Sequence, residues 1–252
     1  MLVLTAPRSG SSWFASLLRS TGQLGLCREW LTSLVYPGAH HHFPHPGPDR
    51  ANREEFVSSL RRTCSTENGV AAVKIIGSTL DALPGILAGW GIGDGVSDAW
   101  VTDLFPDPVV LVLRRCDRIG RAISWWRATS TGQYAQPKDD SAKVPWPDYD
   151  FAALEKAIAD TTEHARRVDA AALHLANAGV HMIDAPYESL MSDPAPVVRA
   201  IAELVGVRLP PDVSLTTDFT IQRDDMTDRV RERLLLDLAA KAARSRVAAD
   251  AS

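Results

Sequence analysis

Residues 2–19 read LVLTAPRSGSSWFASLLR, an apolar run followed by a short polar loop and a segment with helical periodicity. This order predicts a strand, a tight loop and a helix. The first backbone N–H groups of such a helix lack intrahelical partners and point toward the loop, together with the positive end of the helix dipole. The stretch therefore predicts an anion-binding loop. Arg8 and Gly10 fit it, because a guanidinium matches phosphate or sulfate geometry and glycine lets the backbone approach an anion closely.

Four apolar runs rich in β-branched residues alternate with helical patterns. They lie at residues 2–6, 70–76, 109–113 and 180–184. This alternation predicts an α/β fold, a three-layer sandwich in which helices flank a central parallel sheet. Ligands of such sheets bind beyond the carboxyl ends of the strands, where Arg8, Lys74 and Arg115 fall. We expect a single domain over residues 1–252, with an irregular, substrate-facing loop around residues 31–53.

The composition argues against several classes of protein. A formal charge of −4 disfavours a nucleic-acid partner, since binders of phosphate backbones usually carry a basic excess. The three cysteines, Cys27, Cys64 and Cys116, have no C-x-x-C spacing, so they predict neither a disulfide framework nor a zinc site. No segment reaches about 18 continuous apolar residues, and no charged leader precedes the first strand. We therefore expect a cytoplasmic protein without a membrane span.

Four histidines lie close together in the loop around residues 31–53. They are His40, His41, His42 and His45. Adjacent rings cannot all face one metal ion, and no Cys, Asp or Glu nearby completes a second half-site. We therefore expect no bound metal, and we interpret the segment as a loop that contacts the substrate.

Two segments resemble the nucleotide-binding elements of sulfotransferases that use PAPS (3′-phosphoadenosine 5′-phosphosulfate). Residues 8–13, RSGSSW, resemble the loop that binds the 5′-phosphosulfate. In residues 109–128 a buried strand ends in Arg115 and the following helix carries Ser124, which resembles the 3′-phosphate element. The nine-residue separation of Arg115 and Ser124 is similar to that of the Stf0 family of bacterial sulfotransferases. The resemblance implies a P-loop-like fold.

Further stretches resemble the same family and extend the likeness over most of the chain. They are residues 28–30 (REW), 69–76 (GVAAVKII), 183–190 (IDAPYESL) and 222–225 (QRDD). The first is similar to the stretch that holds the family's catalytic glutamate, which nominates Glu29 as the general base. A carboxyl group in a dry cleft should have its pKa raised toward neutrality, which would suit that role.

The resemblance implies a set of site residues. Those expected to take part in catalysis are Glu29, Arg8 and Lys74. Those expected to bind PAPS and its product PAP (adenosine 3′,5′-bisphosphate) are Arg8, Ser9, Gly10, Ser11, Ser12, Trp13, Arg115, Ser124, Tyr187, Gln222 and Arg223. Those expected to contact the acceptor are Glu29, Trp30, His41 and His42. Two choices stay open: Arg114 competes with Arg115 for the 3′-phosphate, and a histidine of residues 40–45 competes with Glu29 as the base.

The expected function is in-line transfer of the sulfuryl group of PAPS to a hydroxyl of a small molecule or glycoside, such as a sugar, glycolipid or natural product, without a metal. One alternative is a magnesium-dependent nucleotide kinase with a degenerate P-loop, which is disfavoured because the G-x-x-x-x-G-K-S/T order is missing. Another is a non-catalytic nucleotide-binding relative. The resemblance also suggests a homodimer.

Overall fold

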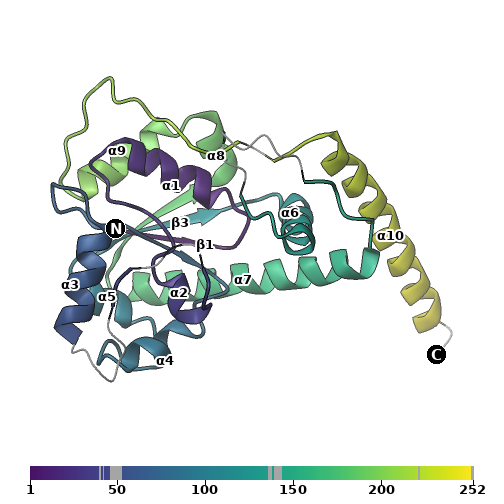
Figure 1. Ribbon diagram of the computed structural model, residues 1–252. Helices are drawn as coiled ribbons and strands as arrows, with labels where there is room; N and C mark the ends of the chain where they lie inside the picture. The colour runs from purple at the N-terminus through teal and green to yellow at the C-terminus, as the bar shows by residue number, and fades with distance from the viewer. Residues whose placement is uncertain are drawn as a thin grey trace. The chain divides into compact units, whose positions relative to one another are not determined.

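In the described part of the chain, four parallel strands form the sheet of the computed structural model, in the order β2-β1-β3-β4. Figure 1 labels the two central strands, β1 and β3. The strands are β1 (Leu2–Thr5), β2 (Val73–Ile76), β3 (Val109–Arg114) and β4 (His181–Pro186). Each overlaps one of the four apolar runs of the sequence. The register pairs Thr5 at the end of β1 with Ile76 of β2 and with Leu113 of β3, so these three strands end at the same edge of the sheet.

The structure describes residues 1–39, 41, 43–45, 53–135, 138, 144–220 and 222–250. The chain divides into two compact units. The first comprises Met1–Cys116 and Glu163–Asp218, and the second comprises Asp117–Thr162 and Phe219–Ser252. The single domain expected over residues 1–252 stays a prediction. Within the loop expected around 31–53, the described residues include the short helix α2 (Thr32–Val35).

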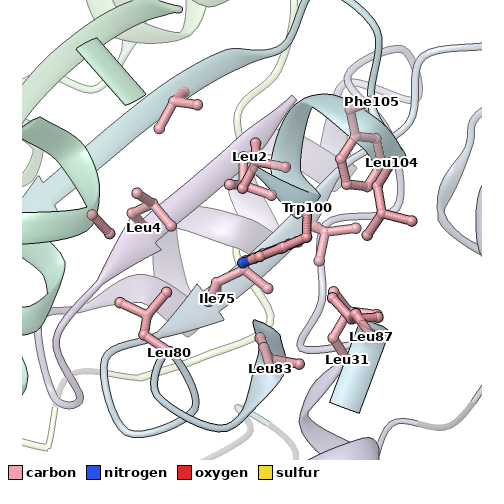
Figure 2. Close-up of a cluster of buried hydrophobic side chains, with 14 of the residues drawn as sticks. Leu2, Leu4, Leu31, Ile75, Leu80, Leu83, Leu87, Trp100, Leu104 and Phe105 are labelled. Atoms are coloured by element: carbon pink, nitrogen blue, oxygen red, sulfur yellow. The ribbon is translucent and has the colours of Figure 1, made fainter. Parts of the chain in front are cut away.

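Both faces of the sheet are covered in the first unit. Side chains alternate between the faces of a strand, so Leu2 and Leu4 of β1 join one hydrophobic cluster and Val3 joins another. The first face is covered by α3 (Arg53–Cys64), α4 (Leu83–Ala88), α5 (Trp100–Leu104) and the later part of α7 (Phe151–Asn177). Figure 2 shows Leu2, Leu4 and Ile75 of the strands beside the fully buried Trp100.

The second face of the sheet packs against helices that follow β1 and β4. They are α1 (Ser11–Ser20), α8 (Tyr187–Ser192) and α9 (Ala195–Leu204). Phe14 and Leu18 of α1 and Val198 and Ile201 of α9 are fully buried there. Two helical layers around one parallel sheet, with a strand, tight loop and helix at the start of the chain, confirm the predicted P-loop-like three-layer α/β fold.

The second unit is helical and has its own core. It contains α6 (Arg118–Thr131), the first part of α7 and α10 (Asp225–Asp250). Trp126, Leu154 and Leu234, one from each helix, are buried together. The sequence pattern predicts the last helix over residues 224–243, whereas α10 continues to Asp250. The added residues, 244–250, contain two arginines and two alanines, which are good helix formers. No helix among the described residues is long and apolar enough to cross a membrane.

The fold predicts a strong effect of a methyl group at Gly77, which follows β2. An added Cβ there would lie 2.4 Å from the carbonyl oxygen of His164 on α7. Because backbone atoms of a packed helix cannot move aside cheaply, we expect Gly77→Ala to lower the free energy of unfolding by about 1–3 kcal/mol. Urea denaturation followed by circular dichroism measures it.

Gly85→Ala is the matched control on α4. A Cβ at Gly85 meets only the carbonyl oxygen of Gly95, at 3.9 Å, and alanine should stabilise a helix relative to glycine by about 0.5–1 kcal/mol. Equal unfolding free energies for the two variants would contradict the close contact between Gly77 and α7.

Candidate active site

The loop between β1 and α1 has the geometry of an anion cradle. Arg8 and Gly10 both have left-handed backbone conformations, with φ of 64° and 77°. Gly10 is the N-cap of α1 and, among the described residues, no side chain caps the first turn of this helix. Ser9 is fully buried, and its hydroxyl finds no hydrogen-bond partner in the described part of the chain. The uncapped N–H groups and this hydroxyl are donors suited to an anion at the loop.

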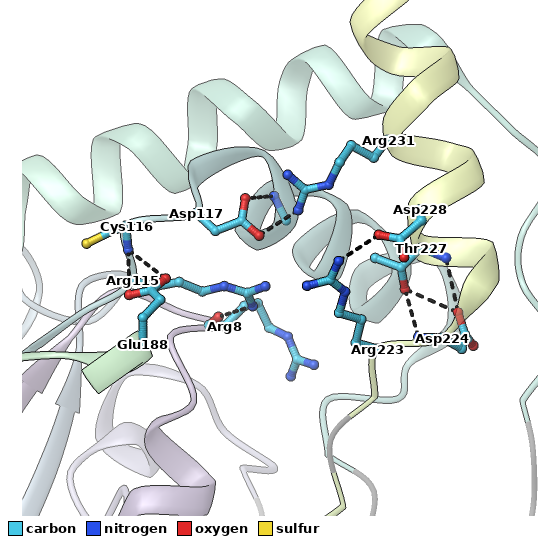
Figure 3. A network of polar contacts seen from close by, with 11 residues as sticks. Arg8, Arg115, Cys116, Asp117, Glu188, Arg223, Asp224, Thr227, Asp228 and Arg231 are labelled. Carbon is cyan, nitrogen blue, oxygen red and sulfur yellow. Dashed lines mark hydrogen bonds and ion pairs between the residues drawn. The ribbon is translucent and has the colours of Figure 1, made fainter. Parts of the chain in front are cut away.

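Arg115, the residue after β3, lies against this loop. Its Nη1 donates a hydrogen bond to the carbonyl oxygen of Arg8 at 3.2 Å (Figure 3). The guanidinium also lies 5.5 Å from the centre of the Tyr187 ring. Tyr187 begins α8, and its ring meets Trp13 edge to face, with ring centres 6.5 Å apart. A Cβ on Gly10 would lie 2.2 Å from the Tyr187 ring, so this ring covers the loop closely.

The neighbouring Arg114 has other partners. Its guanidinium forms ion pairs with Asp169 and, at 3.0 Å, with Asp184. Arg114 is therefore held by two carboxylates, whereas Arg115 contacts the loop; which of them would hold the 3′-phosphate stays open at this point.

Glu188 contacts the backbone next to Arg115, and the sequence analysis did not identify it as a candidate site residue. Both of its carboxylate oxygens accept the backbone N–H of Cys116, at 3.1 and 3.2 Å (Figure 3). This contact fixes the backbone immediately after Arg115. The sequence feature that could have identified Glu188 is its position directly after Tyr187, within residues 183–190.

A second group of site residues lies beside β2. The Lys74 backbone N–H donates to the Arg28 carbonyl oxygen at 2.9 Å, and Arg28 forms an isolated parallel bridge with Val73. This pairing places Glu29 next to Lys74. Lys74 Nζ lies 2.7 Å from Glu29 Oε1 and donates to Ser12 Oγ at 3.1 Å. The Lys74 side chain is 5% exposed and that of Glu29 is 26% exposed.

The pKa of Glu29 departs from its ordinary value in the direction opposite to the one expected. Burial is the largest influence and acts to raise it, but the charge and hydrogen bond of Lys74 act against burial. A hydrogen bond from Thr32 acts in the same direction as Lys74, as does His41 when it is protonated. The net result is a pKa below the ordinary value, so the expectation of a raised pKa is wrong for this arrangement. Thr32, on the first turn of α2, is a second contact that the sequence reasoning missed.

The rings of Trp30 and His41 are in contact with each other. Their rings meet edge to face with centres 5.9 Å apart, and the Arg28 guanidinium lies 5.9 Å from the Trp30 ring centre. Burial, followed by the charge of Arg28, lowers the pKa of His41 to about 4, so its imidazole is neutral at neutral pH. His40 and His42 lie outside the described residues.

Three of the expected site residues belong to the second unit. Ser124 lies on α6, and Gln222 and Arg223 precede α10. The Gln222 carbonyl oxygen accepts a hydrogen bond from Arg127 at 3.2 Å. The exposed Arg223 pairs with Asp228 at 2.9 Å. Their roles toward a nucleotide stay predictions. Among the described residues, no group of three or more His, Cys, Asp or Glu side chains could hold a metal ion.

Comparison with known proteins gives consistent matches over the chain. A model of the Stf0 sulphotransferase family matches residues 1–233. The chain is 26% identical over 256 residues to the trehalose 2-sulfotransferase of Mycobacterium tuberculosis (strain ATCC 35801 / TMC 107 / Erdman), covering 91% of this chain and 93% of the relative.

Two solved structures are also similar to this chain. A sulfotransferase from Alicyclobacillus acidocaldarius has 17% identity and a TM-score of 0.44, with coverage of 96% of this chain and 92% of that one. The sulfotransferase domain from the curacin biosynthetic pathway has 12% identity and a TM-score of 0.41, with coverage of 92% and 96%.

The contact of Tyr187 with the loop predicts that Gly10→Ala destabilises the protein more than Gly22→Ala. Both glycines have positive φ, so each alanine should carry a backbone cost of about 1–2 kcal/mol. A Cβ on Gly22 meets nothing within 4 Å, whereas one on Gly10 must displace the Tyr187 ring. We expect thermal unfolding to show a Tm lower by a few degrees for Gly10→Ala than for Gly22→Ala.

The double variant Gly10→Ala, Tyr187→Ala tests the cause. Removing the ring should make the Gly10→Ala change no more costly than it is at Gly22. An unchanged extra loss of Tm in the Tyr187→Ala background would show that the ring is not responsible.

Proposed function

Because the chain belongs to the Stf0 sulphotransferase family, we propose that it transfers the sulfuryl group of PAPS to a hydroxyl of a small-molecule or glycoside acceptor. One observation carries this proposal beyond the family. Lys74 Nζ contacts both Ser12 of the anion-binding loop and the Glu29 carboxylate, so a donor site and a base are joined by one cation.

The loop residues fit the 5′-phosphosulfate of PAPS. The buried Ser9 hydroxyl has no partner among the described residues, and the first turn of α1 has no side-chain cap there. Arg115 supplies a guanidinium beside the same loop, which would pair with the 3′-phosphate and distinguish PAPS from a nucleotide that lacks it. The aromatic rings of Trp13 and Tyr187 offer surfaces on which an adenine could stack.

The chemistry asks for charge stabilisation and a proton acceptor. When bound, PAPS supplies the sulfuryl group, which passes to the acceptor oxygen while its bond to the 5′-phosphate oxygen breaks and the electron pair stays on that oxygen. Arg8 and the N–H groups of the loop would stabilise the charge on that oxygen. Lys74 would neutralise charge around the transferring group. Glu29 would take the proton of the acceptor hydroxyl and release it to water.

The acceptor side of the proposed site contains Trp30 and His41. An indole ring packs well against the apolar face of a sugar or an aromatic ring, and a neutral imidazole can donate or accept a hydrogen bond from a hydroxyl. The relative from Mycobacterium tuberculosis is named for trehalose, which supports sugars among the acceptors to be tested. A homodimer and a cytoplasmic location stay predictions.

Ligand-induced stabilisation tests the proposed donor. We expect PAP to raise the Tm in the absence of magnesium. The increase should exceed that caused by AMP and that caused by magnesium-ATP, because only PAP offers both a 3′- and a 5′-phosphate to the site. In Arg115→Ala the shift by PAP should fall to that by AMP, since the partner of the 3′-phosphate is lost. Differential scanning fluorimetry measures these shifts.

Arg114→Ala is the matched control, because Arg114 pairs with Asp169 and Asp184. It should keep the advantage of PAP over AMP. A larger Tm shift by magnesium-ATP than by PAP would support a nucleotide kinase. If both arginine variants lost the advantage of PAP over AMP equally, Arg115 would not be the partner of the 3′-phosphate.

Glu29→Gln tests the base. The amide keeps the shape of the side chain but cannot take a proton, so kcat should fall by roughly 10²–10⁴ while the Kd of PAP changes little. Transfer from radiolabelled PAPS to a panel of sugars and phenols, headed by trehalose, measures kcat, and calorimetry measures Kd. Glu203→Gln, on an exposed part of α9, should retain the wild-type rate. An unchanged kcat in Glu29→Gln would shift the role of base to another group, with His41 the first to test.

A further inference from the structure

Lys74 is placed between the two halves of the proposed reaction. It comes from β2, where its N–H is held by the Arg28 carbonyl oxygen. Its Nζ contacts the Glu29 carboxylate at 2.7 Å and the Ser12 hydroxyl at 3.1 Å, and the side chain is almost completely buried. The loop that would hold the donor and the carboxylate that would serve the acceptor are therefore both within reach of one ammonium group.

This ion pair conflicts with the role of Glu29 as a base. A carboxylate held by an ammonium at 2.7 Å is a poor proton acceptor, since the cation stabilises its ionised form. A general base works best when its affinity for protons is matched to the operating pH. The pair must therefore loosen before Glu29 can serve the acceptor well.

The donor supplies an alternative partner for the ammonium. A buried Lys⁺ is costly unless an anion compensates it, and Glu29 provides that compensation in the structure. The sulfonate oxygens of a donor in the loop would lie on the side of Ser12, toward which Lys74 already donates. An ammonium on a flexible stem can exchange one oxygen partner for another with small rotations.

We propose that Lys74 transfers its ion pair from Glu29 to the sulfonate of the bound donor, so that donor binding releases Glu29 to act as the base. This inference rests on the proposed function. It makes Lys74 a positioning residue for Glu29 as well as a counter-charge for the donor. It also predicts that the acceptor hydroxyl is activated efficiently only after the donor has bound.

Among the described residues, the other charged and titratable groups that act on this pair or on His41 are His41 itself, Cys27, Arg28 and Arg19. His41 faces Glu29, and its pKa of about 4 keeps it neutral near pH 5 and above. The buried thiol of Cys27 faces Lys74 and has its pKa raised to about 11 by burial, so it stays neutral. The charge of Arg28 and, less strongly, that of Arg19 act to lower the pKa of His41. Glu29 is therefore the group whose proton occupancy should change when Lys74 moves.

The direction of that change follows from the forces on Glu29. With Lys74 withdrawn, burial remains as the largest influence and raises the pKa, opposed by the hydrogen bond of Thr32, while His41 is neutral near pH 5 and adds no charge there. A carboxyl group whose pKa rises on binding takes up protons at a pH between its two values. Wild-type protein should therefore take up protons through Glu29 when PAPS binds near pH 5.

Isothermal titration calorimetry tests this without any turnover. PAPS is titrated into acceptor-free protein at pH 5 in two buffers with different ionisation enthalpies, which yields the number of protons bound. We expect wild type to take up more protons than Glu29→Gln, by on the order of a few tenths of a proton per site. Protonation changes of the ligand itself are common to both proteins and cancel in this difference.

Two further variants serve as controls. Glu203→Gln should take up as many protons as wild type, because Glu203 is exposed on α9. In the Lys74→Met background the uptake should no longer depend on Glu29, since no ammonium is left to exchange. If Lys74→Met does not fold, as judged by circular dichroism, the comparison of wild type with Glu29→Gln still decides.

Equal proton uptake by wild type and Glu29→Gln, with PAPS bound to both, would overturn the exchange of the ion pair. That result would leave the proposed function intact, because donor binding would have been observed. An absence of PAPS binding by wild type, at pH 5 and at pH 7, would instead count against the proposed function.

Discussion

The hydrogen-bonded register of β1 between β2 and β3 is the constraint on which the site depends. Because Thr5 is level with both Ile76 and Leu113, the polar segments that follow or adjoin these strands begin at one edge of the sheet. The Thr5 hydroxyl donates to the Leu113 carbonyl oxygen at 3.1 Å and ties two of the strand ends directly. A slip of one residue would turn the alternating side chains of β1 to the opposite faces and separate Arg8 from Arg115.

The cationic side chains near the ends of the strands differ in their partners. Arg114 is engaged by Asp169 and Asp184, and it links β3 to α7 and β4. The Arg115 guanidinium donates a hydrogen bond to a backbone carbonyl oxygen of the loop, which brings it next to the residues proposed to hold an anion. Lys74 lies between these cases, because its partner Glu29 is a carboxylate with a proposed task of its own.

Much of this arrangement follows from local sequence. Apolar runs identify the strands, and a residue that follows a strand must emerge at the sheet edge, which is why Arg8 and Arg115 could be nominated. The sequence could not show that Asp169 and Asp184 engage Arg114, because these carboxylates are distant from it in the chain. The predicted direction of the pKa change of Glu29 is wrong for a similar reason. Sequence context suggests that Glu29 is buried, but its contact with Lys74 forms only on folding.

The two halves of the site are anchored on opposite faces of the sheet. Trp13 and Tyr187 pack with the cluster that contains Val3, whereas Trp30 packs with the cluster that contains Leu2. A protein engineer could therefore exchange the segment that carries Trp30 for one with a different specificity without disturbing the packing beneath the nucleotide loop. Any such graft has to keep a carboxylate within reach of the Lys74 ammonium on β2. The Glu29–Lys74 pair is therefore the contact that an exchanged segment must preserve.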